Sequence, residues 1–241
     1  MKRPSTAMVL AAGLGKRLAP ITDTTPKPLV NVAGKPLIDW GLDALSAAGV
    51  SRAIVNVHHL ADQLEAHLAK RRLPEIAISD ERGELLESAG GIIKALDHIG
   101  ADPFYVLNSD TFWVDEGQSN LVLLANEWDD ERMDILLMLA TKDHATGYDG
   151  RGDFHIGADG TLRRLDAGET SPWIYAGAAI VHPRVFADAP QGKASLNRYF
   201  DKAIATGRLF GMPMRGQWVT VGTPDAIGMA EEAVARYGTH G

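Results

Sequence analysis

Short apolar runs alternate with amphipathic stretches along the first part of the chain. The apolar runs predict buried strands, and the stretches whose apolar residues recur at helical spacing predict helices. We expect strands at 6–12, 52–58, 76–78, 104–107 and 133–140, and helices at 36–48, 61–71, 88–98 and 120–128. Strands that alternate with helices in this way form βαβ units, so the pattern predicts an α/β fold with a mostly parallel sheet.

The pattern changes after Gly147. Shorter strands separated by Gly and Asp turns are expected at 154–156, 161–163 and 173–181. Helices at 196–205 and 224–237 flank a further strand at 217–221. We therefore expect a single domain, 1–241, whose nucleotide-binding half (1–140) and smaller mixed half (141–241) share one sheet and close over a cleft.

The composition is that of an ordinary globular domain, with 45% hydrophobic and 23% charged residues. Lys plus Arg is 24 and Asp plus Glu is 31, and the net charge of −7 argues against a nucleic-acid partner. The absence of Cys excludes disulfides, a thiolate nucleophile and Cys-ligated metals. No apolar run approaches the roughly 20 residues of a membrane span, and no signal peptide is recognisable. We expect a cytoplasmic protein with no membrane partner; its oligomeric state is not indicated.

A Gly-rich, basic loop follows the first predicted strand and carries the strongest chemical signal. It reads Leu10-Ala11-Ala12-Gly13-Leu14-Gly15-Lys16-Arg17-Leu18. A P-loop would need a Gly at Leu10, and a dinucleotide fingerprint would need a Gly or Ala at Leu18, so neither template fits. Gly13 and Gly15 allow the backbone to approach a triphosphate closely. Positive charge comes from Lys16, Arg17 and Lys27, the last expected on an exposed loop between two prolines.

With Pro26-Lys27-Pro28-Leu29 and Val32-Ala33-Gly34-Lys35-Pro36-Leu37, this loop resembles the signature of the sugar-1-phosphate nucleotidylyltransferases. These enzymes join an NTP to a sugar 1-phosphate and release pyrophosphate. The resemblance covers nearly the whole chain and implies a Rossmann-like sheet with helices on both faces and a smaller mixed sugar-binding subregion. It also implies that Arg17 and Lys27 are catalytic and embrace the phosphates at the reacting α-phosphorus. The expected nucleotide-binding residues of the loop are Leu10, Ala11, Ala12, Gly13, Gly15 and Lys16.

A second segment, 81–91, precedes and opens a predicted helix. Ser88 is a plausible N-cap, and the helix start would offer free N–H groups. In the family a similar segment reads the base edge; here Ser88 and Gly90 match it best, with Glu81 as an acceptor for a base N–H. The alternative is a capped helix whose Gly pair, Gly90 and Gly91, allows close packing.

A third motif, Leu107-Asn108-Ser109-Asp110-Thr111, ends a predicted strand. A carboxylate at the carboxyl end of a parallel strand faces the ligand crevice. The resemblance implies that Asp110 binds Mg²⁺ as cofactor and that Asn108 contacts the nucleotide. The family's second metal ligand is the Asp of Trp-x-Asp-x-Gly-Thr-Pro, where this chain has Thr220. We expect magnesium held by Asp110, substrate phosphates and water, with Thr220 at most a neutral partner.

Two further segments, 147–154 and 175–177, lie where the family has its sugar loops, so Gly152, Asp153 and Gly177 are expected to bind the sugar. In the family a Glu-Lys pair often precedes the second of these segments, and this chain lacks the Lys of that pair. Arg-Gly-Asp-Phe and Leu-Glu-Ser-Ala-Gly-Gly resemble the short bacterial branch that includes N-acetylmuramate-1-phosphate uridylyltransferases of cell-wall recycling.

The expected small-molecule substrates are therefore UTP and N-acetylmuramate 1-phosphate. A guanylyltransferase for mannose 1-phosphate, or for another hexose or heptose 1-phosphate, stays open. A non-catalytic regulatory protein that binds nucleotide sugars also stays open as an alternative. Its only support is Thr220 at the position of the family's second metal ligand.

Overall fold

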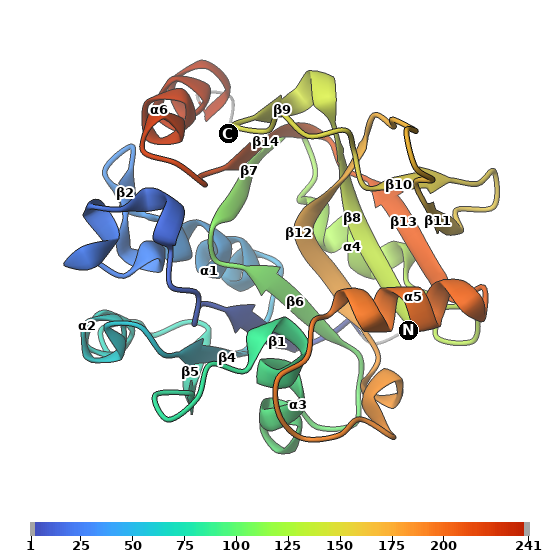
Figure 1. Ribbon diagram of the computed structural model, residues 1–241, viewed down its shortest axis with the longest axis horizontal. Helices are drawn as coiled ribbons and strands as arrows, with labels where there is room; N and C mark the ends of the chain where they lie inside the picture. Colours follow the sequence, from blue (N-terminus) through green and yellow to red (C-terminus); the bar gives the residue numbers. More distant parts are fainter. Residues whose placement is uncertain (1–2, 239–241) are drawn as a thin grey trace.

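The computed structural model describes residues 3–238, and a central sheet organises them (Figure 1). Four neighbouring strands run parallel in the order β5 (Glu75–Asp80), β4 (Arg52–Val57), β1 (Thr6–Leu10) and β6 (Phe104–Asn108). The sheet continues through β12 (Trp173–Val181), β8 (Ile135–Thr141) and β13 (Leu209–Pro213). Of these strands β12 alone is reversed, because it pairs antiparallel with both β6 and β8. The expected mostly parallel sheet, shared by both halves of the chain, is confirmed.

Helices cover both faces of this sheet, as expected. One face is covered by α1 (Leu37–Ala47), α2 (Ala61–Leu68) and α4 (Asn120–Glu127), and the other by α3 (Glu87–Ile99) and α5 (Asn197–Ala205). Successive strand residues point to opposite faces, so Val9 packs with the first set of helices and Met8 with the second. Both side chains are at most 1% exposed. The apolar runs read as strands are therefore buried on both sides, as in parallel sheets generally.

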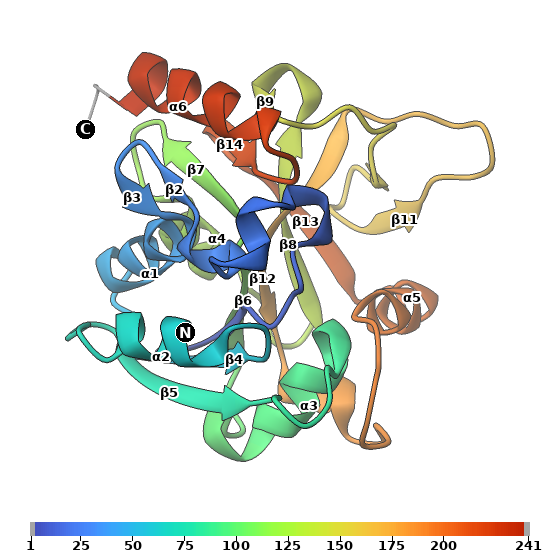
Figure 2. The same cartoon turned by 60° about the vertical axis from the view of Figure 1, so that its left-hand side comes forward.

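A smaller sheet lies beside the carboxyl end of β6 and consists of β7 (Thr111–Asp115), β14 (Gly216–Thr220) and β9 (Ala145–Thr146). It packs against α6 (Asp225–Tyr237) through a third core that includes Phe112, Val219 and Ala230. Figure 2 shows α6 lying over this sheet, close to the hairpin of β2 (Asn31–Val32) and β3 (Lys35–Pro36). This layer brings the C-terminal segment next to the loop that follows β1.

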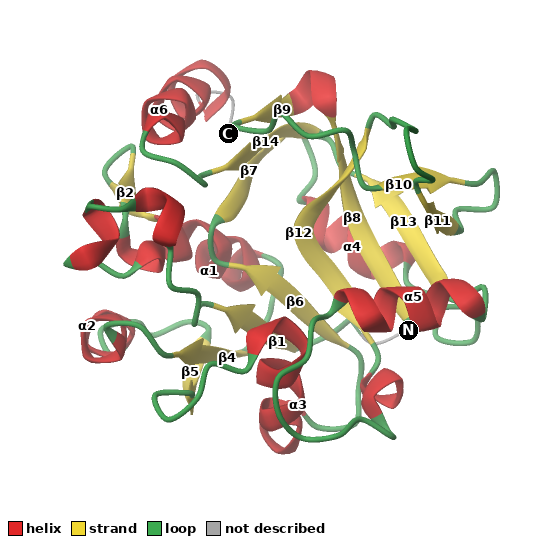
Figure 3. Ribbon diagram, viewed as in Figure 1, coloured by secondary structure: helices red, strands yellow, loops and turns green. Residues whose placement is uncertain are grey.

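The remaining strands form an antiparallel ribbon, β10 (Phe154–Ile156) and β11 (Leu162–Arg164), which joins β12 where Phe154 pairs with Trp173 (Figure 3). Short 3-10 turns interrupt the loops: η1 (Lys16–Leu18), η2 (Ile21–Asp23), η3 (Lys27–Leu29), η4 (Lys142–His144) and η5 (Pro183–Phe186). Five of the described strands were not expected from the sequence: β2, β3, β7, β9 and β13. None of the helices that the structure describes is long and apolar enough to cross a membrane.

Candidate active site

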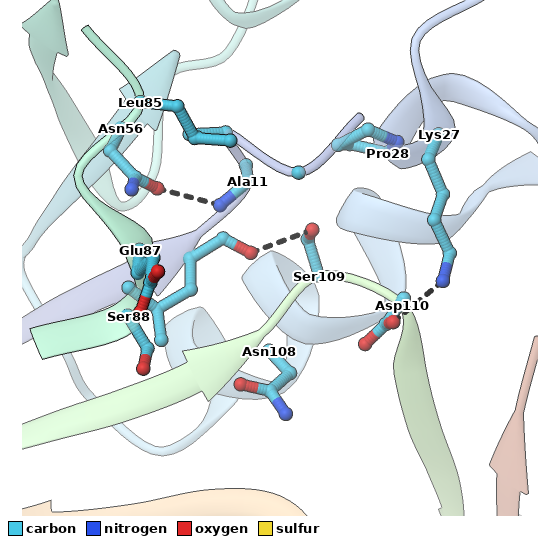
Figure 4. Close-up of a pocket in the computed structure, with 13 residues that line it drawn as sticks. Ala11, Lys27, Pro28, Asn56, Leu85, Glu87, Ser88, Asn108, Ser109 and Asp110 are labelled. Atoms are coloured by element: carbon cyan, nitrogen blue, oxygen red, sulfur yellow. Dashed lines mark hydrogen bonds and ion pairs between the residues drawn. The ribbon is translucent and has the colours of Figure 1, made fainter. Parts of the chain in front are cut away.

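A pocket of about 310 Å³ opens where β1, β4 and β6 end (Figure 4). The carboxyl ends of parallel strands meet at one edge of a sheet, which is where α/β proteins bind ligands. Its walls come from the loop after β1, from β4, from the start of α3 and from the segment after β6. Of the residues expected from the sequence, the pocket brings together Leu10, Ala11, Ala12, Gly13, Lys27, Ser88, Asn108 and Asp110.

Two polar side chains that the sequence analysis missed hold the start of the first loop. The hydroxyl of Ser109 donates to the carbonyl of Leu10 at 2.8 Å. The backbone N–H of Ala11 donates to Oδ1 of Asn56 at 2.6 Å. Asn56 is detectable in retrospect, because it is an amide inside an otherwise apolar run at 53–57. The loop is thus fixed to both strands that flank β1.

Gly15 does not line the pocket but determines where Lys27 lies. Its φ of 63° is in the left-handed region, which favours glycine. A Cβ at this position would lie 2.8 Å from Cγ2 of Thr22 and 3.0 Å from Cβ of Lys27. The carbonyl of Gly15 also accepts the Thr22 hydroxyl at 3.0 Å. The glycine therefore allows the chain to fold back so that Lys27 reaches the pocket.

The ammonium group of Lys27 pairs with Oδ2 of Asp110 at 2.6 Å. The side chains are 12% and 34% exposed respectively. The expectation that Lys27 lies on an exposed loop is wrong, because the turn of η3 directs its side chain into the pocket against this carboxylate. One cation and one carboxylate thus face each other at the pocket wall.

Arg17 and Lys16 are exposed on η1, outside the pocket lining. The guanidinium of Arg17 lies beside Gly222, where a Cβ would be 3.4 Å from its Cζ. Gly222 follows β14, so Arg17 lies at the end of the strand that carries Thr220. The catalytic role of Arg17 and the nucleotide-binding role of Lys16 stay predictions.

Thr220 is the last residue of β14 in the smaller sheet, and it lies next to Asp110, which directly precedes β7. It pairs with Thr111 across β14 and β7, and the N–H of Val221 donates to the carbonyl of Asp110 at 3.1 Å. Within residues 3–238, no group of three or more His, Cys, Asp or Glu side chains is arranged to hold a metal. Magnesium accepts one or two carboxylates together with phosphates and water. The residues present therefore fit a magnesium ion that shares its coordination with substrate phosphates.

The expectation that Ser88 caps α3 is wrong. The helix begins at Glu87 and its N-cap is Leu86, without a side-chain cap. The Ser88 hydroxyl instead accepts the N–H of Leu196 at 2.8 Å. Glu87 has a φ of 62°, a conformation that costs energy for a residue with a side chain and that is concentrated at functional sites. It also lines the pocket.

Two N–H groups of the first turn of α3 are already bonded to another segment and are not open to a phosphate. Those of Ala89 and Gly90 donate to the carbonyl of Ala194 at 2.8 and 3.1 Å. A Cβ at Gly90 would collide with the carbonyl of Gly192. The close-packing alternative therefore describes this glycine, which lets a segment from the second half of the chain cover the helix start.

Glu81 lies behind the pocket wall and does not line it. It is 1% exposed, and each carboxylate oxygen has a partner: Oε1 accepts Nδ2 of Asn56 at 2.7 Å, and Oε2 accepts the N–H of Leu86 at 3.0 Å. Contrary to expectation, the structure does not present this carboxylate to a base.

None of the three expected sugar residues lines the pocket: Gly177 lies within β12, and Gly152 and Asp153 directly precede β10. A Cβ at Gly177, where φ is 77°, would lie 3.2 Å from Cβ of Asn108. Oδ2 of Asp153 accepts the N–H of Tyr175 at 2.9 Å. The N–H of Gly152 donates to the Tyr148 hydroxyl at 3.0 Å. Gly177 thus adjoins the pocket through Asn108, whereas Asp153 is bonded to the backbone of β12 and Gly152 to Tyr148. The roles of all three stay predictions.

Tyr175 carries a polar atom without a partner. Its hydroxyl is buried and makes no hydrogen bond within residues 3–238. Burial raises the pKa of the phenol, and the negative charge of Asp110 raises it further. Burial also raises the pKa of Asp153, against the opposing effects of the Tyr175 N–H and of Arg164.

A pocket at the carboxyl edge of a parallel sheet, lined by a Gly-containing loop, a lysine and a carboxylate, is the arrangement of a nucleotide-binding α/β enzyme. Residues 6–236 match the family model described as Nucleotidyl transferase, and the chain belongs to this family. The family expected from the first loop is thereby confirmed.

Relatives with known activities agree with this assignment. The chain is 46% identical over 236 residues to the N-acetylmuramate alpha-1-phosphate uridylyltransferase of Caulobacter vibrioides, covering 96% of this chain and 98% of that protein. It is 34% identical to the protein of the same name from Neisseria meningitidis serogroup B, covering 90% and 93%. The catalytic β subunit of a mannose-1-phosphate guanylyltransferase from Xenopus tropicalis is more distant, at 27% identity.

Solved structures share the fold. A UDP-glucose pyrophosphorylase complexed with UDP-glucose matches with a TM-score of 0.79 over 97% of this chain and 99% of that chain. At 16% identity this likeness concerns the fold alone.

Proposed function

We propose that the chain transfers UMP from UTP to N-acetylmuramate 1-phosphate, acting as one nucleotidyltransferase domain in the cytoplasm. The observation that carries the proposal is the Lys27–Asp110 pair beside the loop after β1. It supplies the cation and the carboxylate that phosphoryl-type transfer requires, in a chain similar over nearly its full length to proteins named for this reaction.

In the proposed reaction, an oxygen of the sugar phosphate attacks the α-phosphorus of UTP. A new phosphorus–oxygen bond forms while the bond to the β-phosphate breaks, and the electron pair leaves with pyrophosphate. Lys27, and Arg17 as a second cation, neutralise charge that grows in the transition state. Asp110 would hold Mg²⁺ with Thr220 as a neutral neighbour, and the bound ion would supply further charge neutralisation at the phosphates.

Among the alternatives, a guanylyltransferase has weaker support because its relatives are more distant. A non-catalytic regulatory protein would have no chemical need to keep Lys27 and Asp110 together in the pocket. We propose small-molecule substrates only, with no nucleic-acid or membrane partner.

Release of pyrophosphate from a panel of nucleotides and sugar phosphates tests the proposal. Each of UTP, GTP, CTP, dTTP and ATP is paired with N-acetylmuramate 1-phosphate, N-acetylglucosamine 1-phosphate, glucose 1-phosphate and mannose 1-phosphate, with Mg²⁺ present. We expect the highest kcat/KM for UTP with N-acetylmuramate 1-phosphate. Preference for GTP with mannose 1-phosphate would favour the guanylyltransferase, and no pyrophosphate from any pair would contradict an enzymatic function.

A further inference from the structure

A pair of polar side chains is buried at the pocket wall, where Asn56 lines the pocket and Glu81 lies behind it. Asn56 at the end of β4 is 2% exposed, and Glu81 in the loop before α3 is 1% exposed. Polar groups buried to this degree cost free energy unless each finds a partner. Here each side-chain oxygen and nitrogen of the pair has a partner, and the bonds connect the β1 loop to the segment before α3.

The connection is a chain of three hydrogen bonds. The N–H of Ala11 donates to Oδ1 of Asn56 at 2.6 Å, and Nδ2 of Asn56 donates to Oε1 of Glu81 at 2.7 Å. Oε2 of Glu81 accepts the N–H of Leu86 at 3.0 Å. The chain of hydrogen bonds begins and ends at a backbone N–H donor, that of Ala11 and that of Leu86. The two side chains between them must therefore offer an acceptor to each backbone N–H, and one of the two must donate to the other. An amide next to a carboxylate meets this requirement.

Further contacts hold Glu81 from its other sides. Its carbonyl oxygen accepts the N–H of Glu84 at 3.0 Å and lies 2.7 Å from Nδ1 of His58. A Cβ at Gly91 would lie 2.6 Å from Oε1 of Glu81 and 2.7 Å from Nδ2 of Asn56. Gly91 therefore lets α3 approach the pair, which fixes the helix and the loop before it to the end of β4.

The pair is connected to one side of the pocket. Ala11, Asn56, Leu85 and Ser88 line that side in Figure 4, whereas Lys27 and Asp110 lie across from it. We propose that Asn56 and Glu81 are positioning residues that set the spacing between the β1 loop and the start of α3. Through this spacing they determine affinity for the nucleotide rather than for the sugar phosphate. This inference rests on the proposed function.

Replacing Glu81 by Gln, which has nearly the same shape, tests whether the arrangement of hydrogen-bond donors and acceptors in this pair matters. In Glu81→Gln, one of the two donors that face the side chain, Asn56 or Leu86, would meet the new amide nitrogen. Because a buried donor would be left without an acceptor, the spacing between the β1 loop and α3 should relax. We expect KM for UTP to rise roughly tenfold, with KM for the sugar phosphate within about twofold of wild type.

A double variant restores the pattern. In Asn56→Asp with Glu81→Gln, the new carboxylate would accept from Ala11 and from the new amide, whose oxygen would accept from Leu86. We expect the double variant to regain a KM for UTP within about threefold of wild type, a rescue that non-specific destabilisation would not produce.

The matched control is Tyr105→Phe, which removes another buried hydrogen bond, from the Tyr105 hydroxyl to the carbonyl of Leu121 at 2.9 Å. It should lower Tm without changing KM for UTP. An unchanged KM for UTP in Glu81→Gln overturns the inference, as does a double variant that stays impaired or does not fold. If Glu81→Gln alone does not fold, the KM for UTP of the double variant tests the inference. A wild-type enzyme that uses no nucleotide would instead refute the proposed function.

Discussion

Nζ of Lys27 lies 2.6 Å from Oδ2 of Asp110, so the lysine proposed to contact phosphate and the carboxylate proposed to bind magnesium neutralise each other in this structure. A partly exposed ion pair contributes little to stability, because water screens it. The two groups can therefore separate at low cost. We infer that binding of a magnesium–nucleotide complex exchanges partners, with Lys27 moving to phosphate and Asp110 to the metal.

Replacing Lys27 by Ala should reduce kcat far more than stability. Charge neutralisation in the transition state is lost, and removal of one such group typically costs about 10²–10³ in kcat. Asp110 keeps 34% of its side chain exposed, so its charge stays hydrated and Tm should change little. Steady-state kinetics and thermal melting measure both. The control is Lys70→Ala on the exposed surface, and near-normal turnover of Lys27→Ala would refute the assigned role.

Asp110→Asn should abolish magnesium-dependent activity while leaving the fold intact. The amide is similar in shape but lacks the charge that attracts the cation. The measurement is activity as a function of Mg²⁺ concentration, with circular dichroism as the control for folding. A variant with the wild-type magnesium dependence would show that the metal is held elsewhere.

Thr220→Asp should tighten magnesium binding in the absence of nucleotide. The new carboxylate would stand on β14 beside Asp110, at a similar side-chain volume. Turnover need not rise, since the added negative charge also repels phosphates. Calorimetric titration of Mg²⁺ into both proteins provides the comparison. Equal affinities would mean that Thr220 does not face the metal.

Tyr175→Phe should leave Tm unchanged or raise it, because the buried hydroxyl has no partner among residues 3–238. Removing an unsatisfied polar atom stabilises the fold by up to about 1 kcal/mol. If the hydroxyl contacts the sugar phosphate, KM for that substrate should rise about five- to tenfold while KM for UTP stays constant. Unchanged values for both substrates would exclude this contact.

Asp153 should destabilise the fold increasingly as pH rises. Burial raises its folded-state pKa above the ordinary value of 3.8, so the neutral form is favoured on folding. That stabilisation is complete below the unfolded pKa and is lost as pH rises through the folded one. The Tm of Asp153→Asn minus that of wild type should therefore increase from about pH 4 upward until Asp153 is fully ionised. A constant difference across pH would contradict the raised pKa.

The sequence predicted the elements whose signals are local. Apolar runs and helical spacing located β1, β4, β6, β8 and the helices of the first half. It missed β13, whose short run contains Gly211 and Pro213 and whose identity as a strand depends on parallel pairing with β8. It also missed β7, because Thr111–Asp115 follows β6 almost directly and becomes a strand through its pairing with β14.

The site residues also divide into those whose signal lies within a short segment and those whose partners lie far away in the sequence. Gly13, Lys27 and Asp110 were predicted from motifs within short segments and they line the pocket, whereas Gly15, Lys16 and Arg17 do not. The start of α3 was not predicted correctly, since its partners lie about a hundred residues away along the chain: the carbonyl of Ala194 accepts two helix N–H groups, and the N–H of Leu196 donates to the Ser88 hydroxyl. Glu81 was assigned to a base because its actual partner, Asn56, lies in β4, 25 residues earlier in the chain.

The reversed strand β12 lies between β6 and β8, although it follows both in the sequence. During synthesis, β6 and β8 leave the ribosome before the strand that joins them exists. Until then, β6 and β8 each have an unpaired edge, and exposed strand edges promote association with other chains. Chaperone dependence during translation should therefore fall once residues 173–181 have emerged, and fall again when residues 209–213 supply β13 as the second partner of β8. Ribosome-bound chains stalled before and after that point would differ sharply in protease resistance.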